Sequence, residues 1–454
     1  MKIVVAGLGP TGISVIKELI RQGVPTKNIH LIDKSIYSAT PTLPPNSQEV
    51  RESIYDAVVR ERRNNGLGKI GQSLTNENNK FSTPSSVWGV SCFPPLDWEV
   101  GTDKFSKQDF TEAYRRLAEE MQIQAEASSN LQFEISGEII GQLKRKTLSQ
   151  ELVSVPNFHH SRLAVRTKNG CTLTGNCFVK CPNSAPWNPL AATNDLLLEF
   201  PDLQFYHSEI LSINLKNRSL DIINATIKFD KLYLGLGGLE TQRLLQKNFK
   251  SKIALDTTPV VILPIYFKKR QNNIDYRQSF LFTDLIIPRI SQNKLISLTQ
   301  IYLPTKEITA RVISRLPRIF HRILGDYLEK LFAILFQRIG VAMIFLQATD
   351  VNDQTLNYSE FNEARKELSA VLSQAAIKII PGKRELLLRG ASYHYGSIRF
   401  EHETKKGVDS DLFRILAENE IFPTDTSALP QIPPGPHTSI SAALAKLIVE
   451  KSLK

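Results

Sequence analysis

The first 33 residues contain two short apolar runs with a helical pattern between them. Residues 2–6 (KIVVA) and 29–33 (IHLID) are apolar and rich in β-branched residues, which predicts two buried strands. The apolar positions between them repeat every three or four residues, which predicts an amphipathic helix. Its apolar face consists of Ile13, Ile16, Leu19 and Ile20. A strand, a helix and a strand in this order are typical of a parallel α/β sheet.

Polar and apolar patterns predict further elements along the chain. The run SEILSINL (208–215) predicts a strand, and KLYLGLG (231–237) predicts a buried strand that leads into a helix opened by Gly237 and Gly238. In the middle of the chain, PVVILPIYF (259–267) and KLISLTQIYLP (294–304) also read as strands.

The segment 310–340 differs from the rest because arginines accompany its helical apolar pattern. Pro317 is expected to divide it into two helices, since proline is tolerated in a first turn but not in a helix interior. Such a basic amphipathic pair can lie on an anionic membrane surface. It can equally pack on its own sheet while the arginines face water, or the arginines can bind substrate phosphates. The arginines are Arg311, Arg315, Arg318 and Arg322.

The composition is that of an ordinary globular protein. The 454 residues are 42% hydrophobic and 22% charged, with a net charge of +11 that suits an anionic partner or a basic solvated surface. We expect no nucleic-acid partner, because no motif of an RNA- or DNA-binding module is found. The N-terminus does not resemble a signal peptide, and no apolar run is long enough to span a membrane. These features predict a cytoplasmic protein, either free or peripheral to a membrane.

The turn after the first strand, GLGPTG, is typical of a dinucleotide-binding site. Its glycines, Gly7, Gly9 and Gly12, allow a tight turn, a close approach of the backbone to a pyrophosphate, and close packing of helix on strand, respectively. The helix N-terminus offers N–H groups and a positive dipole to the phosphates. Asp33, 21 residues after Gly12, would accept hydrogen bonds from the ribose. This motif predicts dinucleotide binding without separating FAD from NAD. The other residues expected to contact the cofactor here are Pro10, Thr11 and Lys34.

Five later segments resemble, in order, motifs of the glucose–methanol–choline (GMC) family of FAD-dependent oxidoreductases. SSVWGVSCFPPLDWEVG (85–101) resembles the loop that lies along the flavin, and an amphipathic helix, FTEAYRRLAEEM, follows it. GCTLTGNCFVKCPNSAPWNPLAATNDLLLEFPDL (170–203) includes a stretch that resembles a cysteine-containing motif of bacterial members. FDKLYLGLGGLETQRLLQ (229–246) resembles the return of the chain to the FAD domain. GASYHYGSIRF (390–400) and IFPTDTSALPQIPPGPHTSISAALAKLIVEK (421–451) resemble the two C-terminal signatures.

This resemblance implies that the dinucleotide is FAD, held without a covalent bond because no histidine stands near Trp88. It also implies that the backbone at Ile210 touches the adenine, that Asp425 lies near the ribityl and phosphate groups, and that the helix after Thr438 points its positive end at the flavin. The full set of FAD contacts implied by these later segments is Ser86, Val87, Trp88, Ile210, Gly237, Asp425, Thr426, His437 and Thr438.

The resemblance places two histidines in the active site. Alcohol oxidation needs a base for the hydroxyl proton, and a histidine suits this task because its pKa lies near neutrality. His394 is the expected acid/base, and His437 is the partner that orients the substrate hydroxyl, although the two roles can be exchanged. Cys171, Cys177 and Cys181 lack a fourth ligand, so we expect packing cysteines and no metal site.

The predicted fold class is α/β, a discontinuous Rossmann-like FAD-binding domain with an inserted α+β substrate domain. The expected parts are 1–110 and 166–250 for the FAD-binding domain, 111–165 for a cap segment, 251–387 for the substrate domain, and 388–454 for the catalytic C-terminal segment. The predicted reaction is oxidation of an alcohol on a small, sugar-type or lipid-linked substrate, with oxygen, a quinone or a protein as electron acceptor. The alternatives are an NADPH-using flavin monooxygenase and a redox-silent flavin protein at a membrane surface.

Overall fold

A computed structural model provides the structure of the chain. It describes residues 1–34, 90–93, 105–123, 159–160, 162–165, 185–249, 256–268, 283, 285–291, 294–304, 338–350, 358–380, 386–388, 415–429 and 432–454. Within these ranges, no helix is both long enough and apolar enough to cross a bilayer.

The N-terminal strand lies at the centre of a five-stranded parallel sheet. The sheet has the order β17-β8-β1-β2-β4, and every neighbouring pair in it is parallel. Counted along the chain from the β4 edge, this is the doubly wound order 3-2-1-4-5. Ligands of such sheets bind at the carboxyl edge where the strand order reverses, which here is between β1 and β8. The strands are β1 (Ile3–Ala6), β2 (Ile29–Asp33), β4 (Gln204–His207), β8 (Lys231–Leu234) and β17 (Ile421–Pro423).

Alternate residues of the parallel sheet enter two different cores. Ile3 and Val5 pack on one face against α1 (Pro10–Arg21), α6 (Pro189–Glu199) and α12 (Thr438–Ser452). Val4 and Ala6 point to the other face, where they meet α7 (Gly238–Phe249) and a small antiparallel sheet. This alternation is the two-residue period of a strand. The small sheet consists of β5 (Ile210–Asn214), β6 (Ser219–Ile222) and β7 (Ala225–Lys228).

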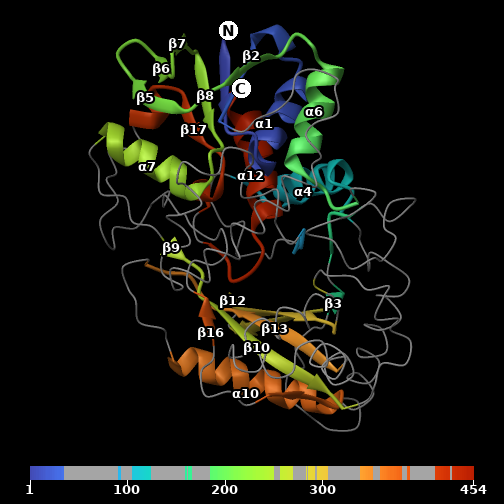
Figure 1. Ribbon diagram of the computed structural model, residues 1–454. Helices are drawn as coiled ribbons and strands as arrows, with labels where there is room; N and C mark the ends of the chain where they lie inside the picture. The colour runs from blue at the N-terminus through green and yellow to red at the C-terminus, as the bar shows by residue number, and fades with distance from the viewer. Residues whose placement is uncertain are drawn as a thin grey trace, which may run out of the picture.

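A fifth helix, α4 (Lys107–Glu120), packs on the outer side of α12. It begins with a capping box in which Ser106 and Asp109 bond each other's backbone N–H groups. Its buried side chains, Phe110, Ala113, Tyr114 and Leu117, recur at helical spacing, as the sequence pattern predicts. The first and last elements of the chain thus belong to one layered unit (Figure 1).

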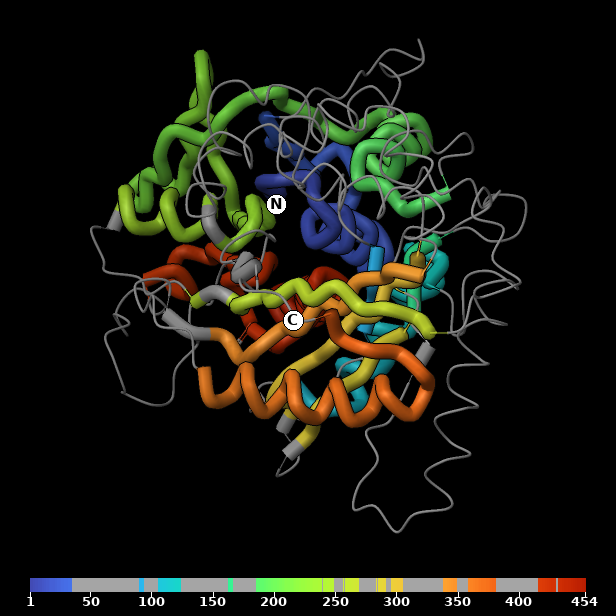
Figure 2. The backbone as a smooth tube through the Cα atoms, turned by 60° about the horizontal axis from the view of Figure 1, so that its bottom comes forward, coloured from blue at the N-terminus to red at the C-terminus, as the bar shows by residue number. Residues whose placement is uncertain are grey.

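A second, antiparallel sheet lies below this unit in Figure 1. One face of it is covered by α10 (Tyr358–Gln374), which runs along the strands in Figure 2. A two-stranded ladder of β9 (Asp256–Thr257) and β14 (Thr349–Asp350) is separate from it. The sheet has the order β15-β10-β13-β12-β11-β3, and β16 pairs with β10. Its strands are β3 (His159–His160), β10 (Val260–Phe267), β11 (Leu285–Ser291), β12 (Lys294–Tyr302), β13 (Ile339–Phe345), β15 (Ile377–Ile379) and β16 (Leu386–Leu388).

The predicted fold class is confirmed, with a parallel Rossmann-like sheet in one unit and an antiparallel sheet with a helix in the other. The predicted strands at 259–267 and 294–304 are β10 and β12. Most of the basic segment 310–340 lies outside the described residues, and its last two residues begin β13. The four sequence boundaries between the five parts stay predictions.

Candidate functional site

The glycine-rich turn after β1 is packed so closely that side chains cannot enter it. Gly7 has φ +88°, and a Cβ atom there would lie 2.4 Å from the carbonyl oxygen of Gly235 at the end of β8. A Cβ atom at Gly12 would lie 1.8 Å from the oxygen of Gly7. The first and third glycines of the motif therefore perform the tight turn and the close helix–strand contact that the sequence predicts.

Helix α1 begins at this turn, and no side chain of the described residues forms a capping hydrogen bond at its N-terminus. Gly9 is the N-cap, and Pro10 is the first helical residue. Backbone N–H groups and the positive end of the helix dipole remain for a ligand there, as at phosphate-binding helix ends. We call the turn from Gly7 to Gly12, with the start of α1, the glycine cradle. It lies at the switch point of the sheet and fits the pyrophosphate of a dinucleotide.

Asp33 ends β2 and is buried, with 6% of its surface exposed. Its Oδ2 accepts a hydrogen bond of 2.6 Å from the backbone N–H of Leu8, which lies inside the glycine-rich turn. The carboxylate thus holds the turn in place, a role that motif spacing alone does not reveal. The next residue, Lys34, is exposed, and its carbonyl oxygen lies 2.9 Å from His207 Nε2 on β4.

Asp425 lies on the same edge of the sheet, at the N-cap of the short helix η3 (Thr426–Ala428). Its carboxylate accepts hydrogen bonds from the N–H of Gly237 (2.9 Å), the N–H of Ser427 (2.8 Å) and the hydroxyl of Thr241. Burial raises the pKa of Asp425, and these donors act against that rise. The residue therefore ties the end of β17 to the start of α7, beside the glycine-rich turn.

His437 is the N-cap of α12 and is 97% buried, with 3% of its surface exposed. Its Nδ1 lies 3.3 Å from the carbonyl oxygen of Gly435. Because a carbonyl only accepts, this contact selects the tautomer with the proton on Nδ1 and the lone pair on Nε2. Burial lowers the pKa of His437 from its usual 6.5 to about 4. The imidazole is therefore neutral at pH 7 and able to accept a proton.

This lowered pKa makes stability depend on pH in a defined direction. The unfolded chain binds the His437 proton as the pH falls through 6.5, whereas the folded chain binds it only near pH 4. We expect the free energy of unfolding to decrease by about 3 kcal/mol across this window because of this group alone, with no contribution above it. Urea unfolding of the wild type and of His437→Gln at several pH values measures the difference. His207→Gln, at an exposed histidine, is the control. Equal pH dependence in wild type and His437→Gln would contradict this assignment.

The antiparallel sheet turns one face toward this unit. A Cβ atom at Gly435 would lie 2.9 Å from Leu298 Cδ2 on β12, so the chain just before His437 touches the sheet. Gln300, also on β12, donates a hydrogen bond of 3.2 Å to Ser91 Oγ and accepts one of 2.9 Å from the hydroxyl of Tyr302. These contacts join the two units next to His437.

Two rows of side chains on that face are mostly apolar. Ile262, Met343 and Gln300 form one row across β10, β13 and β12. Pro264, Val341 and Tyr302 form the next row. The alternate residues of these strands, such as Leu263 and Ala342, pack on the side of α10. Except for buried Gln300, the side chains of the two rows are only partly buried.

The structure brings together most of the predicted cofactor residues. Those at the edge of the parallel sheet or in the turns beside it are Gly7, Gly9, Pro10, Thr11, Gly12, Asp33, Lys34, Gly237, Asp425, Thr426, His437 and Thr438. Ile210 begins β5 in the adjoining small sheet. Ser86, Val87, Trp88 and His394 lie outside the described residues, and their roles stay predictions.

Two further residues belong to the same edge but were not predicted. Gly235 lies against the first turn of α1, where an added Cβ would lie 3.2 Å from Thr11 Oγ1. Thr241 bonds Asp425 from α7. The glycine-rich sequence LGLGG at 234–238 indicates that Gly235 belongs to a close turn, whereas no local sequence pattern indicates a role for Thr241.

Three of the four cysteines, Cys171, Cys177 and Cys181, also lie outside the described residues. The fourth, Cys92, is buried beneath α12, and burial raises the pKa of its thiol to about 12. It is therefore a neutral packing residue and a poor nucleophile. No group of metal-ligating side chains occurs within the described ranges.

Comparison with known proteins identifies the fold. No protein-family model and no curated protein matches the chain. A pyridoxine 4-oxidase from Mesorbium loti matches over 99% of this chain and 98% of its own, with 12% identity and a TM-score of 0.61. A formate oxidase from Aspergillus oryzae RIB40, studied for the effect of a mutation on FAD modification, matches over 99% and 97%, with 10% identity and a TM-score of 0.59. The chain shares the fold of these oxidases over nearly its whole length, which confirms the fold that the GMC resemblance implied.

Proposed function

We propose that this protein is an FAD-dependent oxidoreductase of the GMC type that oxidises an alcohol to a carbonyl compound. The observation that carries the proposal is the position of His437, a buried neutral histidine at the N-terminus of α12. This helix packs directly on α1, whose N-terminus is the glycine cradle. The helix end that would bind a dinucleotide and a histidine that would accept a proton thus lie in the same layered unit.

The described residues fit FAD, and we propose that the cofactor is held without a covalent bond. The N–H groups at the start of α1 would receive the pyrophosphate, with Gly9 allowing its close approach. Asp33 and Asp425 lie on either side of the turn, where the GMC resemblance implies ribose and ribityl contacts. When bound, FAD supplies the acceptor for the hydride that leaves the alcohol carbon.

His437 would act as the base for the substrate hydroxyl. With its Nδ1 proton directed at Gly435, the imidazole presents the Nε2 lone pair to a proton donor. The pKa of His437, lowered to about 4 by burial, keeps the imidazole neutral at pH 7, the protonation state that a base requires. The product leaves as the carbonyl compound, and His437 then releases the accepted proton to solvent. His394, which has the matching position in the resemblance, remains the proposed partner in this step.

The substrate is proposed to be an apolar alcohol. The two rows on β10, β13 and β12 that face the FAD-binding unit offer aliphatic, proline and methionine side chains. Their polar groups, Gln300 and the Tyr302 hydroxyl, already bond each other and Ser91. A sugar would bury several hydroxyl groups against this face without partners, which is costly. An aromatic or aliphatic alcohol would instead gain from contact with it.

Anaerobic mixing of the purified protein with single alcohols tests the proposal. We expect a flavin absorption spectrum that bleaches with benzyl alcohol or 1-octanol and bleaches much more slowly with glucose. Pyridoxine is included because one structural neighbour is a pyridoxine 4-oxidase. A flavin reduced by dithionite but by none of these alcohols would refute alcohol oxidation. Reduction by NADPH alone would favour the monooxygenase alternative instead.

A further inference from the structure

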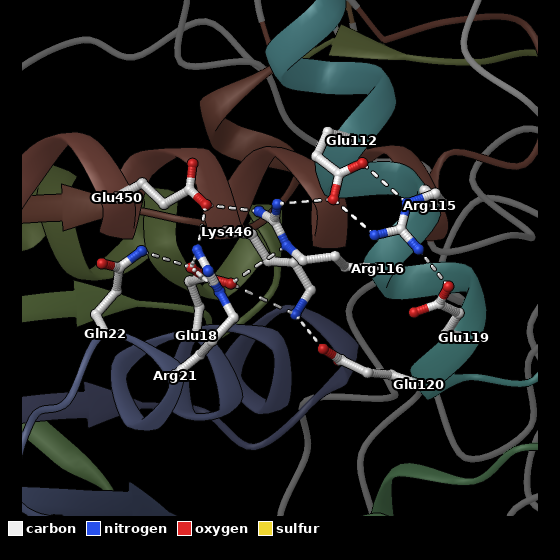
Figure 3. A network of polar contacts seen from close by, with 10 residues as sticks. All are labelled: Glu18, Arg21, Gln22, Glu112, Arg115, Arg116, Glu119, Glu120, Lys446 and Glu450. Atoms are coloured by element: carbon white, nitrogen blue, oxygen red, sulfur yellow. Dashed lines mark hydrogen bonds and ion pairs between the residues drawn. The ribbon is translucent and has the colours of Figure 1, made fainter.

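A group of six charged side chains lies where α1, α4 and α12 meet (Figure 3). We call it the three-helix ion network, and each helix contributes two members. Two of the six, Glu18 and Lys446, have completely buried side chains. The members are Glu18 and Arg21 on α1, Arg116 and Glu120 on α4, and Lys446 and Glu450 on α12.

Nearly every contact in the network joins two different helices. Lys446 Nζ on α12 donates to Glu120 Oε1 on α4 at 2.6 Å and lies 4.0 Å from Glu18 Oε2 on α1. Glu450 accepts from both Arg21 and Arg116, each at 2.6 Å. Arg116 also lies 3.8 Å from Glu18. The network therefore connects the three helices to one another. In contrast, the bonds of Arg115 to other described residues are to Glu112 and Glu119, both within α4.

Such a network is an inefficient source of stability. Burial lowers the pKa of Lys446, which shows that its charge is costly there. Burial also tends to raise the pKa of Glu18, but hydrogen bonds from Arg21 and Gln22 and the charge of Lys446 outweigh it, so this pKa is lowered. Buried ion pairs of this kind are often replaced by apolar residues without loss of stability, and their best-attested role is to specify register.

The register that this network would specify is the axial alignment of α1 with α12. Arg21 on α1 bonds Glu450 on α12, which is 429 positions later in the sequence. Gly9 and Thr438, which lie at the starts of the same two helices, are also 429 positions apart. Glu18 and Lys446 each lie nine residues after the N-cap of their helix. The two helices are therefore parallel and in step, with the glycine cradle and His437 at the same end.

Apolar packing between these helices defines their axial position only weakly. The buried residues of α12 are mostly small in its first two turns, where Ser439, Ser441, Ala442, Ala443 and Ala445 are found. Small side chains allow close approach but interlock little, so a sliding motion meets few steric barriers. A charged pair buried between the helices opposes such sliding, because displacement leaves both charges unpaired in a low-dielectric interior.

We propose that Glu18 and Lys446, with their partners in the three-helix ion network, are positioning residues that hold His437 in register with the dinucleotide-binding turn. The network lies about 13 Å along α12 from His437, at 1.5 Å per residue, so it acts through the helix and not by contact with a ligand. The functional part of this inference rests on the proposed alcohol oxidation, whereas the register itself does not.

The double replacement Glu18→Gln, Lys446→Met tests the inference, because it removes both completely buried charges at similar volume. We expect a melting temperature within about 4 °C of the wild type, and flavin reduction slower on the order of tenfold or more, since small misplacements of a catalytic group are costly. The ring signal of His437 in a ¹H–¹³C NMR spectrum, assigned by its loss in His437→Gln, is expected to shift. Arg115→Gln, which breaks two contacts within α4 alone, is the matched control and should change neither signal nor rate.

An unshifted His437 signal together with an unchanged reduction rate in the double variant would overturn the inference. If the double variant does not fold, Glu120→Gln provides the second test, since it removes only the 2.6 Å partner of Lys446 and should shift the same signal less. An unshifted signal there would also overturn it. If the wild type shows no alcohol-reducible flavin, the proposed function fails, while the NMR comparison still decides whether the network sets the register.

Discussion

Replacing His437 with alanine is expected to slow anaerobic reduction of the bound flavin by about two orders of magnitude, the usual loss for a removed acid/base. FAD should remain bound, because the side chain does not cap α12 and the glycine cradle belongs to a different helix. Stopped-flow bleaching of the flavin absorbance by an alcohol substrate measures the rate. The flavin-to-protein ratio of the purified variant measures binding.

His437→Gln separates the loss of the proton acceptor from the loss of volume, since glutamine fills much of the same space but is not a base near pH 7. It should be as slow as the alanine variant. His30→Ala is the control, because His30 lies near the amino end of β2, stacked on Tyr206 and away from the carboxyl edge of the sheet. Unchanged reduction kinetics in His437→Ala would remove the residue from the proposed mechanism.

The dinucleotide-binding unit could be predicted from sequence because all of its parts are local. The strands β1 and β2, the helix between them and the glycines of the turn fall within 33 consecutive residues. Each is defined by a short-range rule: periodicity for the strands and helix, and the absence of a Cβ atom at Gly7 and Gly12. The structure reproduces this unit, including the positive φ of Gly7.

The rest of the site depends on contacts that no local pattern contains. Thr241 bonds Asp425 across 184 positions, and Glu18 meets Lys446 only because α1 and α12 pack in parallel. In sequence, Glu18 reads as a polar position on the exposed side of an amphipathic helix, yet its side chain is completely buried. The reason is that α1 packs against the sheet on one side and against α12 on another, and single-helix periodicity reports only the first contact.

The antiparallel sheet could be predicted from the sequence only in part. Strands β10 and β12 were predicted from their apolar runs, but their order in the sheet could not be. Which of their residues face the parallel-sheet unit follows from the register with β13 and from the contact of Leu298 with Gly435. The assignment of an apolar substrate thus needs the structure, whereas the assignment of a dinucleotide does not.

Replacing Gly12 with alanine is expected to abolish FAD binding. The added Cβ would lie 1.8 Å from the carbonyl oxygen of Gly7, and both partners are backbone, so no side-chain rotation relieves the overlap. The turn must open, which separates α1 from β1 and removes the N–H groups of the helix from the phosphate site. We expect a loss of about 3 kcal/mol in the free energy of unfolding, at the upper end for overpacking. The flavin content of the purified variant and its urea unfolding curve measure the two effects.

Gly23→Ala distinguishes this packing effect from backbone strain. Gly23 follows α1 with φ +80°, and a Cβ there would meet nothing within 4 Å. Alanine at that position costs about 1–2 kcal/mol of left-handed strain but leaves the turn closed. The control should therefore lose some stability and keep its flavin, whereas Gly12→Ala should lose both. A Gly12→Ala protein that retains a full complement of FAD would show that the cofactor does not depend on the closed glycine-rich turn, and would undermine the dinucleotide site from which the proposed chemistry begins.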